Sequence, residues 1–158
     1  HLCPALDGQV VAIDGKTVRR SHPRGKRAIH LVSAYGSGLG VVLGQVRTAE
    51  KSNEITAIPE LLDALLLKGA IVTIDAMGCQ RAIAQKIVEA GAAYVLAVKE
   101  NQSALRSRIR MALDAIERVP GAYADCTNEY REVEKGHGRI ETRRCVASNV
   151  LTRGEQGP

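Results

Sequence analysis

The segment Ile71-Val72-Thr73-Ile74-Asp75 is a short apolar and β-branched run that ends in an aspartate. The same pattern occurs earlier in the chain, where the run from Val10 to Ile13 is followed by Asp14. Each run has the length and composition of a buried β-strand. A carboxylate at the end of such a strand faces the crevice in which open α/β sheets bind ligands. If the two strands are neighbours, about 4.8 Å apart, Asp14 and Asp75 can share a metal ion.

Two interpretations of this pair of aspartates are open. In one, the carboxylates hold divalent cations roughly 3.5–4 Å apart, which clamp the attacking and leaving oxygens of a phosphodiester exchange. In the other, each aspartate simply begins a turn after its strand. A basic segment after Asp14 favours the first, because lysine and arginine neutralise phosphates beside acids that hold metal. It contains Lys16, Arg19, Arg20, Arg24, Lys26 and Arg27, and a solvated loop is the alternative interpretation.

Composition limits the class of protein. The chain has 158 residues, a net charge of +5 and 45% hydrophobic residues, enough for the core of one domain. The positive charge favours anionic partners. Phe and Trp are absent, which argues against base stacking on aromatic platforms. Because there is no long apolar stretch and no signal-peptide pattern, we expect a cytoplasmic protein with no membrane partner.

The apolar periodicity predicts an order of elements. We expect three antiparallel strands, then helices alternating with parallel strands, then a longer helix and a short hairpin. The expected strands are residues 10–14, 29–35, 41–46, 71–75 and 93–98, with helices at 53–66, 80–90 and 101–120 and a hairpin within 125–148. This is the order of the ribonuclease-H-like α/β fold, in which the first and fourth strands are neighbours. That fold would bring Asp14 and Asp75 together.

Other features carry weaker signals. The glycine-rich stretch 36–40 lacks the G-x-G-x-x-G spacing and leads into a strand, so nucleotide binding is not expected there. His30 lies within an apolar strand, where a hydrogen-bonded core histidine is the simpler interpretation. The histidines share no metal-ligand spacing, and no serine has a G-x-S-x-G context.

Six strings in one order resemble a known family. They are IDGK (13–16), HLVSAY (30–35), EKSNEI (50–55), TIDAMGCQ (73–80), YVLAVKENQ (94–102) and HGRIETRR (137–144). Together they resemble the catalytic core of bacterial insertion-sequence transposases of the DDE class, in the group that includes the H-repeat-associated proteins. The resemblance implies a ribonuclease-H-like core over residues 1–148, with a mixed sheet flanked by helices and the start of an inserted β region. Residues 149–158 are expected to be a polar tail, disordered or left by truncation.

The resemblance also implies a chemistry. Such a core binds two Mg²⁺ or Mn²⁺ ions and cuts and rejoins DNA at the ends of a mobile element. The aspartate of IDGK is Asp14 and that of TIDAMGCQ is Asp75, which would be the first two metal ligands. One ion would activate water and then a 3′-hydroxyl as nucleophile, and the other would stabilise the leaving oxygen.

The third acid of the family is not evident. It is expected on a late helix in a motif resembling H-W-x-I-E-N, which this sequence lacks, so we interpret the chain as the central part of such a core. Glu141 is the substitute candidate for a catalytic metal ligand. Its arginine neighbours equally predict an ion pair on the hairpin, because cations compete with metal for a carboxylate. Glu50 and Glu54 are further candidates, better explained as acidic residues at a helix N-terminus.

Basic and polar residues near the expected site are candidate DNA contacts, with ordinary surface charge as the alternative. They are Lys16, Arg19 and Arg20 for phosphates, then Lys99, Asn101 and Gln102, with His137 and Arg139 on a flanking strand. The implied partner is double-stranded DNA at element ends and target, in the bacterial cytoplasm at the nucleoid. A homodimer is expected because paired ends must be brought together.

Three functions remain open. The first is a metal-dependent DNA transposase. The second is a truncated, inactive remnant that at most binds DNA, which the missing third glutamate favours. The third is a nuclease of similar fold that also uses Asp14 and Asp75 but cleaves without joining.

Overall fold

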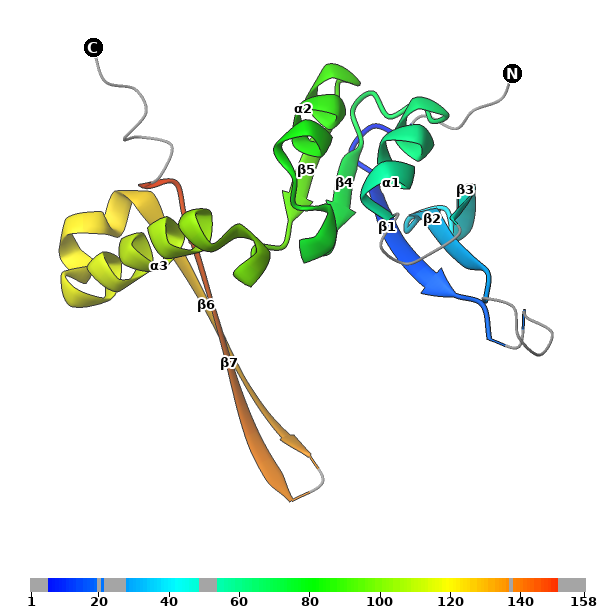
Figure 1. Cartoon of the computed structure of the whole chain (residues 1–158). Coiled ribbons are helices and arrows are strands. Elements are labelled where there is room, and N and C mark those ends of the chain that lie inside the picture. The colour runs from blue at the N-terminus through cyan, green and yellow to red at the C-terminus, as the bar shows by residue number, and fades with distance from the viewer. Residues whose placement is uncertain (1–5, 20, 22–27, 49–53, 137, 151–158) are drawn as a thin grey trace, which may run out of the picture. The chain divides into compact units, whose positions relative to one another are not determined.

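The computed structural model describes residues 6–19, 21, 28–48, 54–136 and 138–150 (Figure 1). The chain divides into two compact units, residues 1–102 and residues 103–158. The boundary falls inside the range 1–148 that the sequence suggests as one core, and that range stays a prediction. No helix within the described ranges is both long enough and apolar enough to cross a membrane.

The first unit is built on a five-stranded mixed sheet in the order β3-β2-β1-β4-β5. The strands are β1 (Val10–Thr17), β2 (His30–Gly36), β3 (Val41–Thr48), β4 (Ile71–Ile74) and β5 (Ala93–Leu96). Antiparallel ladders join β1 to β2 and β2 to β3, whereas β4 pairs in parallel with β1 and with β5. This confirms the predicted ribonuclease-H-like arrangement, with the first and fourth strands side by side.

Two helices cover one face of this sheet. Helix α1 (Glu54–Asp63) contacts β2 and β3, and helix α2 (Arg81–Glu89) contacts β5 and α1. Buried side chains alternate with period two along β2 and β4 and the first half of β1, as expected for a sheet with one covered face. The core includes Val11, Ile13, Val32, Ala34, Val72 and Ile74 of the sheet, with Ile58, Leu61, Leu62, Ile83 and Ile87 of the helices.

The strand and helix boundaries differ in places from the sequence prediction. β1 does not end at Asp14 but runs to Thr17, because residues 15–17 pair with residues 30–32 of β2 after β4 has ended. Helix α1 ends at Asp63, before the expected residue 66, in a turn closed by hydrogen bonds from Ala64 to Leu61 and from Leu65 to Leu62. Leu67, which lies beyond the end of the helix, is also buried in the core, so the run of apolar residues extends past the helix.

The second unit contains helix α3 (Ser103–Arg118), a 3₁₀ segment (Pro120–Cys126) and a hairpin of β6 (Thr127–Gly136) with β7 (Arg139–Ser148). The hairpin was expected to be short, but each strand has ten residues and most of their side chains are exposed. The antiparallel register runs from Thr127 opposite Ser148 to Gly136 opposite Arg139. Backbone pairing therefore holds the hairpin together with little burial.

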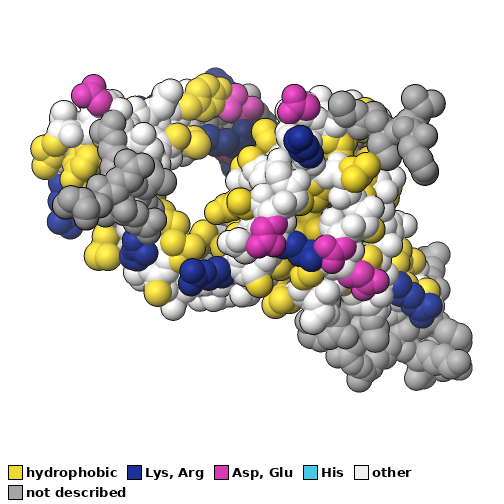
Figure 2. Space-filling model, turned by 90° about the horizontal axis from the view of Figure 1, so that it is seen from above, with side chains coloured by type: hydrophobic (Ala, Val, Ile, Leu, Met, Phe, Trp, Pro, Cys, Tyr) yellow, Lys and Arg dark blue, Asp and Glu magenta, His cyan; other side chains and the backbone are white. Residues whose placement is uncertain are grey.

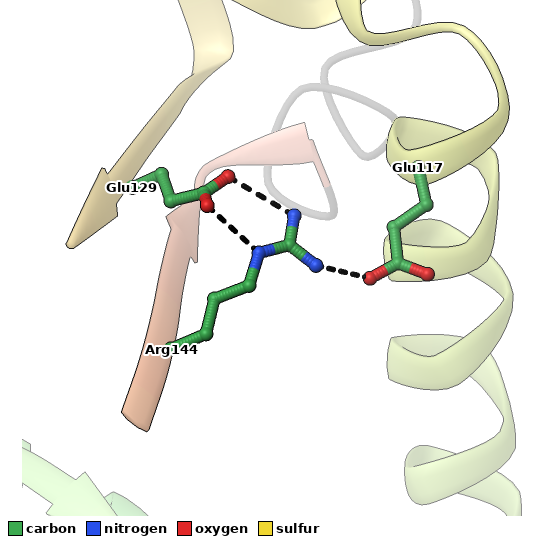
Figure 3. Close-up of polar contacts among 3 residues, drawn as sticks. All are labelled: Glu117, Glu129 and Arg144. Carbon is green, nitrogen blue, oxygen red and sulfur yellow. Dashed lines mark hydrogen bonds and ion pairs between the residues drawn. The ribbon is translucent and has the colours of Figure 1, made fainter. Parts of the chain in front are cut away.

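One arginine connects this hairpin to helix α3 (Figure 3). The guanidinium of Arg144 donates to both carboxylate oxygens of Glu129 at 2.8 and 3.0 Å, and to Glu117 of α3 at 2.6 Å. The hydrogen bond from Arg144 holds the pKa of Glu129 below its ordinary value. The same bonds, first to Glu129 and then to Glu117, raise the pKa of Arg144. Because the guanidinium is planar, its hydrogen bonds to two carboxylates restrict the orientation of the Arg144 side chain as well as the distances to Glu129 and Glu117.

Candidate functional site

The two aspartates follow the last ladder pair between β1 and β4. Ile13 is opposite Ile74 in this parallel pair. Asp14 and Asp75 are the residues that directly follow this pair, one on each of the two neighbouring segments. Neighbouring strands lie about 4.8 Å apart. The register thus places the two acidic residues next to each other at the carboxyl end of β4, as the sequence predicted. Their role as metal ligands stays a prediction.

Asp14 lies on the sheet face opposite the two helices, because Val11 and Ile13 point into the core and side chains alternate along the strand. Its side chain is 60% exposed, and Oδ2 lies 3.5 Å from Nζ of Lys16. Exposed ion pairs of this kind contribute little to stability, on the order of 0–1 kcal/mol. Lys16 can therefore leave this carboxylate at low cost when a stronger cation arrives.

Asp75 begins a turn, as the turn interpretation predicted. Its Oδ1 accepts a hydrogen bond from the backbone N–H of Met77 at 3.0 Å and caps a short 3₁₀ segment, η2 (Ala76–Gly78). A carboxylate has two oxygens, so Oδ2 can bind a cation while Oδ1 caps the turn. The turn and metal interpretations of Asp75 are compatible.

Two neighbouring carboxylates supply oxygen atoms of the kind that hard divalent cations prefer. Magnesium is commonly held by one or two carboxylates together with water and substrate phosphates. Within the described ranges no group of three or more His, Cys, Asp or Glu residues is arranged to hold a metal ion. At this edge of the sheet the described chain thus offers Asp14 and Asp75, and the remaining coordination positions would belong to water or phosphate.

A hydrogen-bonded pair of buried side chains that the sequence did not reveal lies next to Gly15, on the core side of β1. His30 of β2 is 3% exposed, with Nε2 2.5 Å from Oε1 of Glu54 and Nδ1 3.0 Å from Oγ1 of Thr17. The core-histidine interpretation of His30 is therefore confirmed. Glu54 is the first residue of α1 but is buried against His30. A Cβ on Gly15 would lie 2.8 Å from Nε2 of His30 and overlap the Glu54 carboxylate, so this site requires glycine.

Two amide side chains expected to contact DNA have partners within the chain. Nδ2 of Asn101 donates to the carbonyl of Ala76 at 2.5 Å, and Nε2 of Gln102 donates to the carbonyl of Cys79 at 2.7 Å. Arg19 and Lys99 are exposed. Contact of these residues with DNA stays a prediction. Several predicted residues lie outside the described ranges, namely Arg20, Arg24, Lys26, Arg27, Glu50 and His137.

The candidate third acid belongs to the second unit. Glu141 is exposed on β7, and its Oε2 accepts a hydrogen bond from Nη2 of Arg143 at 3.0 Å. Arg143 also donates to Glu134 at 2.7 Å. The predicted ion pair on the hairpin is therefore present, and the role of Glu141 as a third ligand stays a prediction. Arg139 is exposed on the same strand.

Charges of both signs share the surface. Figure 2 shows one face of the molecule, on which acidic and basic side chains are interspersed among apolar ones. Within the first unit, Nζ of Lys86 of α2 lies 2.6 Å from Oδ1 of Asp63 of α1.

Comparison with known proteins gives consistent results. A family model described as "Transposase DDE domain" matches residues 5–150. "Putative transposase YncI" of Escherichia coli (strain K12) is 50% identical over 148 residues, covering 91% of this chain and 57% of that protein. "H repeat-associated putative transposase YhhI" of the same strain is 44% identical over 146 residues, covering 91% of this chain and 38% of that protein. The chain thus spans little more than half of the first relative and less of the second.

One solved structure is similar at lower identity. It is "Cryo-EM structure of piggyBac transposase synaptic complex with hairpin DNA (SNHP)", with a TM-score of 0.45 and 15% identity over 61% of this chain and 24% of that chain. The fold is assigned from the strand order described above and not from this similarity.

Proposed function

The chain belongs to the transposase DDE domain family, and from this membership we propose that it forms the metal-binding core of a DNA transposase. Such an enzyme cleaves and rejoins DNA strands at the ends of an insertion sequence. The observation that carries the proposal is the parallel pairing of Ile13 with Ile74, which makes Asp14 and Asp75 neighbours. Two adjacent carboxylates at a sheet edge suit metal-assisted phosphoryl transfer.

The roles of the individual side chains follow from their positions. Asp14 and Asp75 would hold Mg²⁺ or Mn²⁺, which when bound supplies charge stabilisation for phosphate oxygens and lowers the pKa of a bound water. Lys16, released from Asp14, would neutralise a neighbouring phosphate. Arg19 and Lys99, both exposed, would fix the position of the DNA backbone without reading its sequence.

The proposal extends to partners and place of action. Double-stranded DNA of the element ends and target is the substrate, and two copies of the full-length protein would hold the two ends together. The bacterial nucleoid would be the place of action. Electrostatic binding to phosphates predicts that DNA affinity falls as salt rises.

Strand cleavage with labelled duplex DNA and Mn²⁺ tests this function. We would compare the chain with Asp14→Asn and with a matched control, Asp63→Asn, because Asp63 is also exposed and paired with a lysine. Cleaved and rejoined products that vanish only in Asp14→Asn support the transposase. Cleavage without joining supports the nuclease alternative, and DNA binding without cleavage supports the inactive remnant.

A further inference from the structure

Two consecutive side chains after β5 reach back to the loop that follows β4. Asn101 and Gln102 belong to the 3₁₀ segment η3 (Glu100–Gln102) and donate to the carbonyls of Ala76 and Cys79. These contacts bridge 25 and 23 positions of sequence at 2.5 and 2.7 Å. Both ends of the turn that begins at Asp75 are thus held by one dipeptide.

The turn has little regular structure of its own. Its internal hydrogen bonds run from Met77 to Asp75 Oδ1, from Gly78 to the Asp75 carbonyl and from Cys79 to the Ala76 carbonyl, at 3.0, 3.2 and 3.2 Å. A 3₁₀ segment of three residues has poor hydrogen-bond geometry and no cooperative length. Contacts from elsewhere in the chain must therefore fix it.

Core packing against Ile58 and Ile74 restrains part of this turn. Ala76, Gly78 and Cys79 are buried, and a Cβ on Gly78 would lie 3.2 Å from Cβ of Ile74 and 3.3 Å from Cδ1 of Ile58. The two amides supply the restraint at the carbonyl groups. Without them the Ala76 carbonyl would keep the bond from the Cys79 N–H but lose that from Asn101, and the Cys79 carbonyl would lose its bond from Gln102.

We propose that Asn101 and Gln102 are positioning residues for the Asp75 carboxylate. By holding the Ala76 and Cys79 carbonyls they keep the turn in the conformation in which Oδ1 of Asp75 accepts from Met77. Oδ2 is then preorganised for a cation, and less ordering is needed when the ion binds. This inference rests on the proposed function, in which Asp75 is a metal ligand. It gives the two amides a task other than the predicted contact with DNA.

The test has one readout without metal and one with it. In the metal-free chain we would measure hydrogen exchange of the Met77 amide by NMR for Asn101→Ala, for Gln102→Met and for the double variant. Asn101 is exposed, and methionine keeps the length of Gln102, so these changes remove donors with little loss of packing. Gln85→Met is the matched control, because Gln85 donates to Glu89 on the exposed surface of α2 at 2.9 Å.

The expected result is faster exchange at Met77 and a loss of Mn²⁺ affinity of about 10- to 100-fold, as for other groups that orient metal ligands. The control should change neither quantity. Unchanged exchange, or faster exchange with unchanged Mn²⁺ affinity, would overturn the positioning role. Weaker DNA binding without either change would support the prediction from sequence that both amides contact DNA. If the wild type binds no Mn²⁺, the proposed function fails, and exchange at Met77 alone decides whether the amides hold the turn.

Discussion

Replacement of Gly15 by alanine should destabilise the first unit strongly although it adds one methyl group. Gly15 follows Asp14, and its missing side chain would point to the core side of β1. A Cβ there would lie 2.8 Å from Nε2 of His30 and overlap the Glu54 carboxylate. The side chains of His30 and Glu54 are only 3% and 7% exposed, so neither can move into water without opening the core.

The magnitude follows from these contacts. Forcing a methyl group into filled space costs about 1–3 kcal/mol. Weakening the buried hydrogen bond between His30 and Glu54 costs about 1.5–3 kcal/mol when one partner is charged. The intrinsic advantage of alanine over glycine in a strand returns only about 0.5–1 kcal/mol. We therefore expect the free energy of unfolding to fall by about 1.5–5.5 kcal/mol.

Urea unfolding followed by far-UV circular dichroism measures this change. Gly36→Ala is the matched control in β2, because the three atoms nearest to a Cβ there belong to the Leu43 side chain, the first at 3.4 Å. Its effect should stay within about 1 kcal/mol. In a Glu54→Ala background, where the carboxylate is gone, Gly15→Ala should cost much less. An equal cost for Gly15→Ala in both backgrounds, or a cost no larger than that of Gly36→Ala, would refute the steric explanation.

Two further predictions concern stability. The hydrogen bond from Arg144 lowers the pKa of Glu129. The contribution of this bond to the stability of the hairpin should therefore be fully present above the ordinary pKa of 4.5 and be lost as pH falls through the lowered pKa. Hydrogen exchange of the β6 amides between pH 6 and 3 should show this loss in the wild type but not in Arg144→Ala, and an identical profile in both would contradict it. Leu61→Ala, at a core position only 1% exposed, should cost about 2–5 kcal/mol, whereas Leu66→Ala at a 75% exposed position should stay within about 0.5 kcal/mol. Urea unfolding of both variants decides this, and similar costs would show that α1 does not pack as described.

The sheet could be predicted because its signals are local. Apolar runs and short connections indicate the strands, whereas the pairing of β1 with β4, and with it the meeting of Asp14 and Asp75, is predicted only because the order of elements is that of the ribonuclease-H-like fold. The extension of β1 past Asp14 could not be predicted, since residues 15–17 carry no apolar pattern and are held by pairing with β2.

Partners distant in sequence explain the remaining differences. His30 and Glu54 each have a local interpretation, and only the fold shows that they form one buried pair. Asn101 and Gln102 follow a strand near the site, which suggested DNA contact, but the carbonyls they bind are more than twenty residues away. A side-chain amide can donate to a backbone carbonyl or to a phosphate oxygen, so residue type alone could not decide between these partners.

The most direct measurement is a calorimetric titration of Mn²⁺ into the 158-residue chain and into an Asp14→Ala/Asp75→Ala variant that circular dichroism shows to be folded. Asp63→Ala, which removes an exposed carboxylate from α1, is the control. Saturable binding by the wild type and the control, but not by the double variant, is the predicted result. Equal binding in all three proteins, or binding in none, would contradict the claim that these two aspartates form a metal site.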